Sequence, residues 1–294
     1  MRIMLDYKEF REQLMQEIHR RYGEQKITVE NIFKINKEKE GIMLGESGMV
    51  PVFYTEDLYQ IFSEEADWEA LFRYVETMRK QKPGDFDAEW ITEWKSARKM
   101  VKPYVVNYKR NQELLTNSQS VYQVILDLAV VYYLNLPSEQ GWGLVPVSAG
   151  MLKNWGITAE ELQEQSRKNV VYEIKSLRQL LGKGIPWMNA EEKTEEDSLL
   201  CLSNKETFRG AAGMLIGDCL RDKAQEEHCN FYILPSSIHE VILVKDDGIG
   251  EHAESLKQMV SEINADPAIL PISDYLSDSV YYYDRVEDKV RIAA

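Results

Sequence analysis

The sequence predicts an α+β fold of mixed, largely antiparallel sheets with packed amphipathic helices. Three observations lead to this prediction. The chain has 294 residues, of which 44% are hydrophobic and 29% charged, the composition of a globular protein that buries a core. Apolar residues recur at helical spacing in some segments and alternate in others. These segments follow one another without the regular strand–helix–strand order of a parallel sheet.

The N-terminal segment predicts one helix followed by short strands. Apolar residues at four-residue spacing indicate the helix, namely Phe10, Leu14 and Ile18. We expect it to begin behind Asp6 and to end near Gly23. Residues 26–35 and 41–54 hold β-branched and aromatic residues between glycine-containing turns, which indicates antiparallel strands.

Helical segments are expected next. Thr55 can cap a helical stretch whose apolar stripe continues to the break at Lys82-Pro83-Gly84. Another helix carries apolar residues at helical spacing, namely Phe86, Trp90, Trp94, Ala97 and Val101. We interpret its tryptophans as core residues and not as a ligand platform, because aromatic residues at this spacing usually face a core.

The segment from Tyr122 to Leu136 predicts a strand, because every even-numbered residue in it is apolar. Its length exceeds the ~5 to 6 residues of an average strand. We therefore expect either one bent strand or two segments of a central sheet, closed by Pro137 and Gly141.

Capping signals mark two later helices. Thr158 and Glu161 form a capping box for a helix that runs to about Tyr172. Ser203 and Glu206, after a strand at residues 199–202, offer a second box. The helix behind this second box is rich in glycine, and we expect Gly210, Gly213 and Gly217 to let its backbone pack closely against the sheet.

The last part of the chain predicts two strand pairs and a helix. Residues 230–234 and 238–244 are apolar, β-rich runs joined by Pro235-Ser236-Ser237, which predicts a tight antiparallel connection. A helix with apolar residues at 253, 256, 260 and 263 ends at Asn264. Residues 280–292 predict a final pair of short strands.

We expect two α+β parts, an N-terminal part over residues 1–115 and a C-terminal part over residues 116–294. The charge run from Glu191 to Asp197 is typical of a solvated loop, so we expect limited proteolysis to cut there first.

Charge and cysteine usage restrict the class of protein. The net charge of −14 repels phosphate backbones, so nucleic-acid binding is not expected. The first residues become charged before an apolar export signal could form, and the longest apolar region is too short and too polar to span a membrane. Cys201, Cys219 and Cys229 are odd in number and lack CxxC spacing, so we expect free thiols and a cytoplasmic protein.

Established catalytic motifs are all incomplete in this chain. His239-Glu240 begins a zinc-protease motif, but Leu243 stands where the second histidine is required. Met49 and Pro146 replace the last glycines of a nucleophile elbow and of a dinucleotide fingerprint. Cys219, His228 and Cys229 match no common metal spacing. We therefore predict no metal and no cofactor.

A polar cluster between two apolar runs carries the enzyme alternative. On a strand, Ser237 and His239 share one face, while Glu240 points to the other. A hydrolase-like site would use Ser236 or Ser237 as the nucleophile and His239 as the base, with Asp127 orienting the imidazole. The other interpretation is a turn with a strand histidine.

Several unusual segments occur together in this chain: residues 107–115, 126–132, 155–158, 233–242 and 276–281. With them the sequence resembles, over nearly its full length, an uncharacterised bacterial family, domain of unknown function 5688. Val121-Tyr122 stands where that family often has a Pro-His pair, so a reaction that used this histidine would be missing here. The resemblance implies a bacterial cytoplasmic protein and supplies no activity.

The function we expect first is that of a non-catalytic binding or protein-interaction module, because each catalytic signature is incomplete. The positive feature is Tyr281-Tyr282-Tyr283, where strand alternation places at least one aromatic on the less buried face, available to a protein partner. The alternative is a hydrolase-like enzyme with its site at Pro235 to Glu240.

Overall fold

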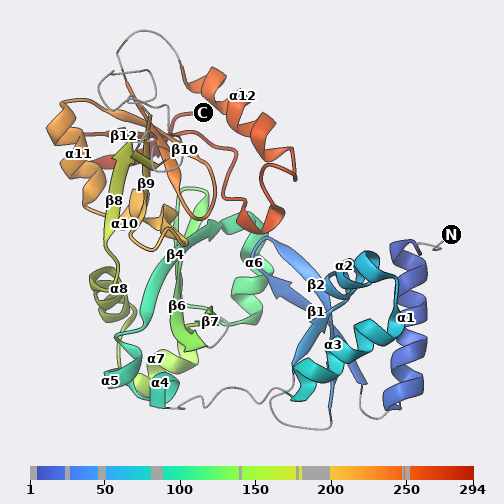
Figure 1. The fold of residues 1–294 in the computed structure, drawn as a ribbon. Coiled ribbons are helices and arrows are strands. Elements are labelled where there is room, and N and C mark those ends of the chain that lie inside the picture. Colours follow the sequence, from blue (N-terminus) through green and yellow to red (C-terminus); the bar gives the residue numbers. More distant parts are fainter. Residues whose placement is uncertain are drawn as a thin grey trace. The chain divides into compact units, whose positions relative to one another are not determined.

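The protein is described from a computed structural model over residues 5–23, 27–45, 51–80, 89–138, 141–176, 179–180, 199–246, 248 and 252–294. It has the α+β architecture, with three sheets whose paired strands run antiparallel (Figure 1). The chain forms two compact units, Met1–Asp87 and Ala88–Ala294. The segment from Glu191 to Asp197, where we expect proteolysis, lies outside the described residues.

The first unit packs helices on one face of a small sheet of order β1-β2-β3. Its elements are α1 (Tyr7–Tyr22), β1 (Ile27–Lys34), β2 (Lys37–Leu44), β3 (Val52–Tyr54), α2 (Thr55–Glu65) and α3 (Trp68–Lys80). The predicted helix and strands are confirmed, and Asp6 and Glu9 close a capping box at the start of α1. Thr55 does not cap α2, because it is the first residue inside the helix and Tyr54 occupies the cap position; its hydroxyl donates to Glu40 Oε1 at 2.8 Å.

The second unit begins with short helices and a sheet of order β4-β6-β5, with β7 paired to β6. Its first elements are α4 (Glu89–Thr92), α5 (Trp94–Ala97), β4 (Val101–Asn107), α6 (Tyr108–Asn117), β5 (Tyr122–Ile125), β6 (Leu128–Ser138), β7 (Gly141–Pro146), α7 (Ala149–Trp155) and α8 (Ala159–Lys168). β4 lies before the boundary that we expected at residue 115, and it pairs with β6 inside the second unit. Val101 was expected in a helix, but this β-branched residue opens β4.

The predicted strand from Tyr122 to Leu136 is two strands of one hairpin, the second of the two expected arrangements. Val124 pairs with Ala129 and Ile125 with Leu128. Leu126 has a φ of 58°, so the chain reverses at Leu126 and Asp127 although the apolar alternation continues through the turn. This turn presents Asp127 at the end of the sheet.

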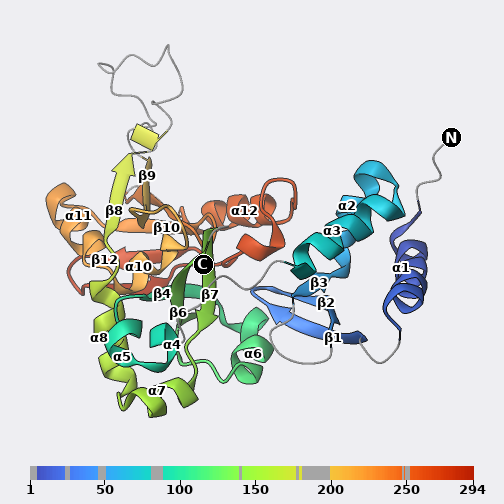
Figure 2. The same cartoon turned by 60° about the horizontal axis from the view of Figure 1, so that its bottom comes forward.

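The rest of the second unit is a six-stranded sheet of order β13-β12-β10-β11-β9-β8 with helices on both faces (Figure 2). Its elements are β8 (Tyr172–Ser176), β9 (Leu199–Asn204), the 3₁₀ helix η3 (Gly210–Ala212), α10 (Gly213–Ile216), α11 (Cys219–Glu227), β10 (Phe231–Pro235), β11 (Val241–Lys245), α12 (Ala253–Asn264), the 3₁₀ helix η4 (Ile272–Asp274), β12 (Tyr281–Asp284) and β13 (Lys289–Ile292). The predicted antiparallel pair is confirmed, but its second strand starts at Val241 and not at Ile238, because residues 236–240 form the connection. The helix ending at Asn264 and the final strand pair are confirmed.

The two faces of this sheet have different covers. On one face the core side chains, including Leu202, Leu243 and Ile233, pack against η3, α10 and α11. On the other face Val260 of α12 packs with Leu234 and Val280. Alternation along β8 and β9 puts Glu173, Lys175, Cys201 and Ser203 on this second face.

The capping box predicted at Ser203 and Glu206 is wrong. Ser203 belongs to β9, and its hydroxyl donates to the carbonyl of His239 at 2.8 Å. The first helical turn starts only at Gly210. The predicted role of the glycines is confirmed, because a Cβ on Gly213 would stand 2.6 Å from Tyr172 Cδ1 and 2.7 Å from Leu202 Cδ2.

Candidate functional site

The candidate site is built on the connection between β10 and β11. Strand pairing ends at Pro235 and Val241, and the amide of Ser237 donates to the carbonyl of Glu240 at 3.1 Å. The Ser237 hydroxyl accepts the amide of His239 at 3.0 Å. Proline and two serines therefore form a hydrogen-bonded turn, as their turn chemistry predicts.

The Glu240 carboxylate accepts hydrogen bonds from both serine hydroxyls of the turn. Ser237 Oγ donates to Glu240 Oε1 at 2.8 Å, and Ser236 Oγ donates to the same oxygen at 3.1 Å. Each hydroxyl proton is thereby directed to a carboxylate within the turn. The arrangement fixes Glu240 as a hydrogen-bond acceptor, because an ionised carboxylate has no proton to donate.

Both ring nitrogens of His239 face groups other than the serine hydroxyls. Its Nδ1 accepts the backbone amide of Arg209 at 3.1 Å, and its Nε2 lies 3.7 Å from Asp274 Oδ1. The ring centroid lies 5.4 Å from that of Phe208. Among the described residues neither Ser236 nor Ser237 hydrogen-bonds the imidazole, so the described geometry holds no serine–histidine pair.

Arg209 presents its backbone to the site and its guanidinium to aromatic rings. The guanidinium carbon lies 5.4 Å from the ring centroids of both Tyr104 and Phe208. Burial lowers the pKa of Arg209, while the nearby tyrosines and Asp274 act in the opposite direction. Arg209 contributes to the turn through its backbone amide, which hydrogen-bonds the His239 ring.

Asp127 is engaged elsewhere in the second unit. Its Oδ2 accepts the hydroxyls of Ser277 at 2.6 Å and Ser279 at 3.2 Å, and its Oδ1 accepts Tyr281 at 2.7 Å. None of these partners belongs to the β10–β11 connection. The carboxylate beside His239 is that of Asp274, which sequence reasoning missed because a separate 3₁₀ turn brings it there.

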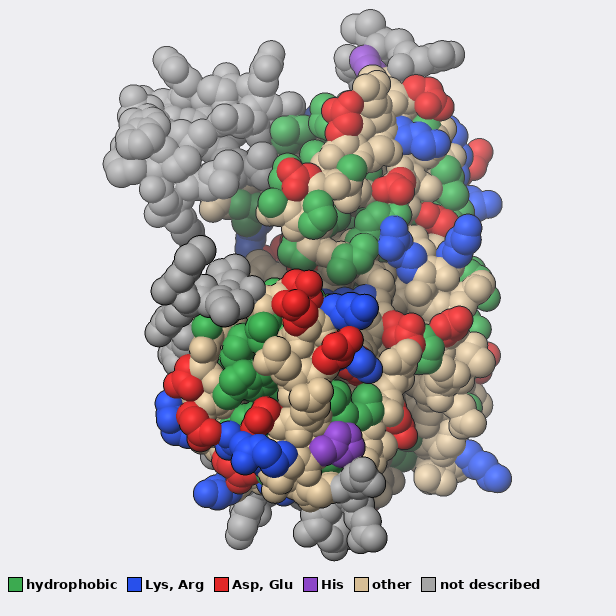
Figure 3. All heavy atoms as spheres, turned by 90° about the vertical axis from the view of Figure 1, so that its right-hand side faces the viewer, with side chains coloured by type: hydrophobic (Ala, Val, Ile, Leu, Met, Phe, Trp, Pro, Cys, Tyr) green, Lys and Arg blue, Asp and Glu red, His purple; other side chains and the backbone are tan. Residues whose placement is uncertain are grey.

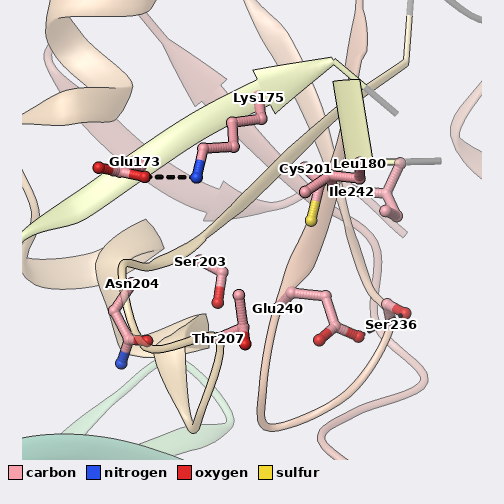
Figure 4. A pocket seen from close by; sticks show the side chains of 10 residues that line it. All are labelled: Glu173, Lys175, Leu180, Cys201, Ser203, Asn204, Thr207, Ser236, Glu240 and Ile242. Atoms are coloured by element: carbon pink, nitrogen blue, oxygen red, sulfur yellow. Dashed lines mark hydrogen bonds and ion pairs between the residues drawn. The ribbon is translucent and has the colours of Figure 1, made fainter. Parts of the chain in front are cut away.

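A pocket of 310 Å³ opens beside the turn (Figure 4). Of the predicted site residues only Ser236 and Glu240 line it. The other lining residues come mainly from β8, β9 and the turn after β9: Glu173, Lys175, Leu180, Cys201, Ser203, Asn204, Thr207 and Ile242. Sequence reasoning missed this set, because only the pairing of β8 with β9 and of β9 with β11 brings it to one place.

Charged groups face each other across the pocket. Lys175 Nζ lies 2.6 Å from Glu173 Oε2 on the same strand, and Glu240 stands opposite them (Figure 4). Burial raises the pKa of the Cys201 thiol to about 11, and the negative charge of Glu240 adds to that effect. The thiol is therefore neutral near pH 7 and unsuited to nucleophilic attack.

The tyrosine run offers no free aromatic surface. Tyr281 and Tyr283 belong to the core, with 0% and 3% of their surface exposed. Tyr282 points to the other face as alternation requires, but it is only 8% exposed because Tyr232 and Arg291 pack on its ring. The expectation of an available aromatic in this run is wrong.

Metal ligands are not gathered in the described part of the chain. Within it, no three His, Cys, Asp or Glu side chains lie close enough to hold a metal ion. Cys201, Cys219 and Cys229 are free thiols. None of the helices described in the structure has the length and apolar character that crossing a membrane requires.

Residues 7–285 match the model of a family of unknown function, DUF5688. The chain belongs to this family. The match covers nearly all of the sequence and includes parts of both compact units. No curated protein and no solved structure matches the chain. The DUF5688 family description assigns no activity.

Proposed function

We propose that this DUF5688 protein is a non-catalytic binding module, and that its ligand site is the pocket between β8, β9 and the β10–β11 connection. One observation carries the proposal: a carboxylate held by two serine hydroxyls stands at the wall of a 310 Å³ pocket. The volume lies at the lower end of the ~300 to 1,000 Å³ range of small-molecule sites.

The rigidity of the pocket wall supports binding. Ser236 and Ser237 both hydrogen-bond Glu240 within a stretch of five residues, and strand pairing fixes both ends of that turn. Ser203 ties β9 to the same turn through the carbonyl of His239. Such a preformed site loses little conformational freedom when a ligand enters.

The pocket also keeps the hydrolase alternative open as a second candidate, because Ser236 lines it. That activity would require His239 to leave the Arg209 amide and to turn its ring toward a serine. A screen of ester, phosphoester and peptide substrates with the parent and with His239→Ala tests it. Turnover by the parent that His239→Ala abolishes would favour the enzyme over the binding module.

The remaining expectations belong to the same proposal. We place the protein in the bacterial cytoplasm, expect a small ligand or a protein partner, and expect no nucleic acid. Acidic and basic side chains are interspersed on the face shown in Figure 3, in keeping with the excess of 49 acidic over 35 basic residues. The described residues on that face form no basic stripe of the kind that phosphate backbones need.

A blocking variant tests the binding module. Leu180 lines the pocket and is 40% exposed, so Leu180→Trp fills the space with little effect on the core. Val171→Trp is the matched control, because Val171 is 56% exposed and does not line the pocket. Compounds found by a thermal-shift or ligand-observed NMR screen should lose binding to Leu180→Trp and keep it with Val171→Trp. Hits that bind both variants equally, or a screen without hits, would overturn the proposal.

A further inference from the structure

Each hydroxyl group that lines the pocket already donates its proton in a hydrogen bond within the protein. Ser236 donates to Glu240 at 3.1 Å, Ser203 donates to the carbonyl of His239 at 2.8 Å, and Thr207 donates to the carbonyl of Glu206 at 2.8 Å. A hydroxyl has one proton and two lone pairs. Each of these three groups therefore offers a ligand only acceptor lone pairs.

The Glu240 carboxylate adds the strongest acceptor. Both serine hydroxyls bind its Oε1, whereas Oε2 has no hydrogen-bond partner among the described residues. Among the described residues, Oε2 is not one of the buried side-chain atoms that lack a partner. It is therefore accessible to solvent. Figure 4 shows the carboxylate extending toward Ser236 at the wall of the pocket. A ligand in the pocket thus meets an accessible anionic oxygen.

The charge balance of the wall is negative. Lys175 pairs with Glu173 at 2.6 Å, and Lys205, which does not line the pocket, lies 3.8 Å from the other Glu173 oxygen. Among the lining residues Glu240 is the carboxylate that pairs with neither lysine. Leu180 and Ile242 give the pocket an apolar side. The pocket therefore favours a molecule that is cationic at one end and apolar along its length.

We infer that the ligand of this pocket carries a protonated primary amine on an aliphatic stem, with the ammonium bound to Glu240 Oε2 and the stem against Leu180 and Ile242. This inference rests on the proposed function. An ammonium has three donors and no acceptor, which complements Glu240 Oε2 and the hydroxyl oxygens of Ser236, Ser203 and Thr207. A free alkylamine and a lysine side chain of a protein partner both present this chemistry, so the experiment separates the two.

The test is a calorimetric titration of the full chain with n-pentylamine. The uncharged probe is n-pentanol and the anionic probe is pentanoate, which have similar stems. n-Pentylamine should bind at least about tenfold more tightly than either, since an ionic hydrogen bond is worth about one to two decades of affinity. A short lysine-containing peptide and its norleucine counterpart form the second arm. Tighter binding of the lysine peptide than of n-pentylamine assigns the amine to a protein partner, and the reverse assigns it to a free amine.

Two variants locate the amine. Glu240→Gln keeps an oxygen for the serines but puts an amide where the anionic oxygen was, so n-pentylamine should bind about 10- to 100-fold more weakly. Glu113→Gln makes the same charge change at an exposed position of α6 outside the pocket and should leave affinity unchanged. Unfolding midpoints of both variants show whether the fold is retained.

The outcomes separate the two proposals. If n-pentanol binds as tightly as n-pentylamine and Leu180→Trp abolishes both, the pocket binds ligands but the cationic inference fails. If Glu240→Gln and Glu113→Gln bind n-pentylamine equally, the inference also fails. If the probes and the compound screen all give no binding, the proposed function fails as well.

Discussion

Asp127 provides the most informative stability test, because its carboxylate connects the β5–β6 turn to the segment before β12. It accepts Ser277 at 2.6 Å, Ser279 at 3.2 Å and Tyr281 at 2.7 Å. Tyr281 is 0% exposed and Ser277 is 2% exposed, so water cannot readily replace the lost acceptor. Asp127→Ala leaves both hydroxyls without this partner.

The magnitude follows from those two buried groups. An unsatisfied buried donor costs about 1 to 3 kcal/mol, and the third, more accessible serine adds little, so Asp127→Ala should lower the free energy of unfolding by about 2 to 6 kcal/mol. Asp127→Asn keeps an acceptor oxygen and should lose about half as much or less. Urea denaturation followed by circular dichroism measures both values.

A double-mutant cycle with Tyr281→Phe isolates the central hydrogen bond. Because Tyr281→Phe removes the hydroxyl that Asp127→Ala would leave unpaired, Asp127→Ala should be less harmful by about 1 to 3 kcal/mol in that background. A loss below about 0.5 kcal/mol for Asp127→Ala, the level of an ordinary surface substitution, would refute the structural role. Equal losses in both backgrounds would refute the pairing with Tyr281.

Two further predictions concern packing and pH. Gly213→Ala should destabilise the fold by about 1 to 3 kcal/mol in urea denaturation, because its Cβ would lie 2.6 Å from Tyr172 Cδ1. Glu227 binds Lys223 and Lys245, which lowers its pKa to about 2, so its stabilisation is complete above the ordinary pKa of ~4.3 and is lost as the pH falls from there toward 2. Glu227→Gln should reduce that acid-dependent loss by less than about 1 kcal/mol, since the pair is solvent-screened.

Each of these two predictions has its own contradicting result. A Gly213→Ala protein as stable as the parent would mean that the helical segment can move away from β8. A Glu227→Gln protein whose loss of stability between pH 4.3 and 2 equals that of the parent would mean that the two lysines do not act through Glu227.

Local signals in the sequence predicted elements where the signal and the tertiary environment agree. Asp6 with Glu9 and Thr158 with Glu161 start helices in the structure because both halves of each capping box can form. Ser203 and Glu206 have the same spacing, but β9 pairs with β11 and holds Ser203 in the sheet. A capping motif therefore cannot be told from a strand end without knowledge of strand pairing.

The same limit applies to the site. Residues 235–240 could be recognised as a polar turn, and Glu240 proved to be its centre. The pocket that Glu240 and Lys175 both line could not be predicted, because it depends on the order β11-β9-β8. Asp127 and Asp274 are both carboxylates on turns, and only the three-dimensional structure shows which of them lies beside His239.

The most direct measurement of the central claim is a crystal structure of the full chain soaked with n-pentylamine. The account predicts the ammonium nitrogen at about 2.7 to 2.9 Å from Glu240 Oε2, the distance of a charge-assisted hydrogen bond, with the stem beside Ile242. Electron density for the amine at another place on the molecule, with the pocket beside Glu240 holding only water, would contradict it.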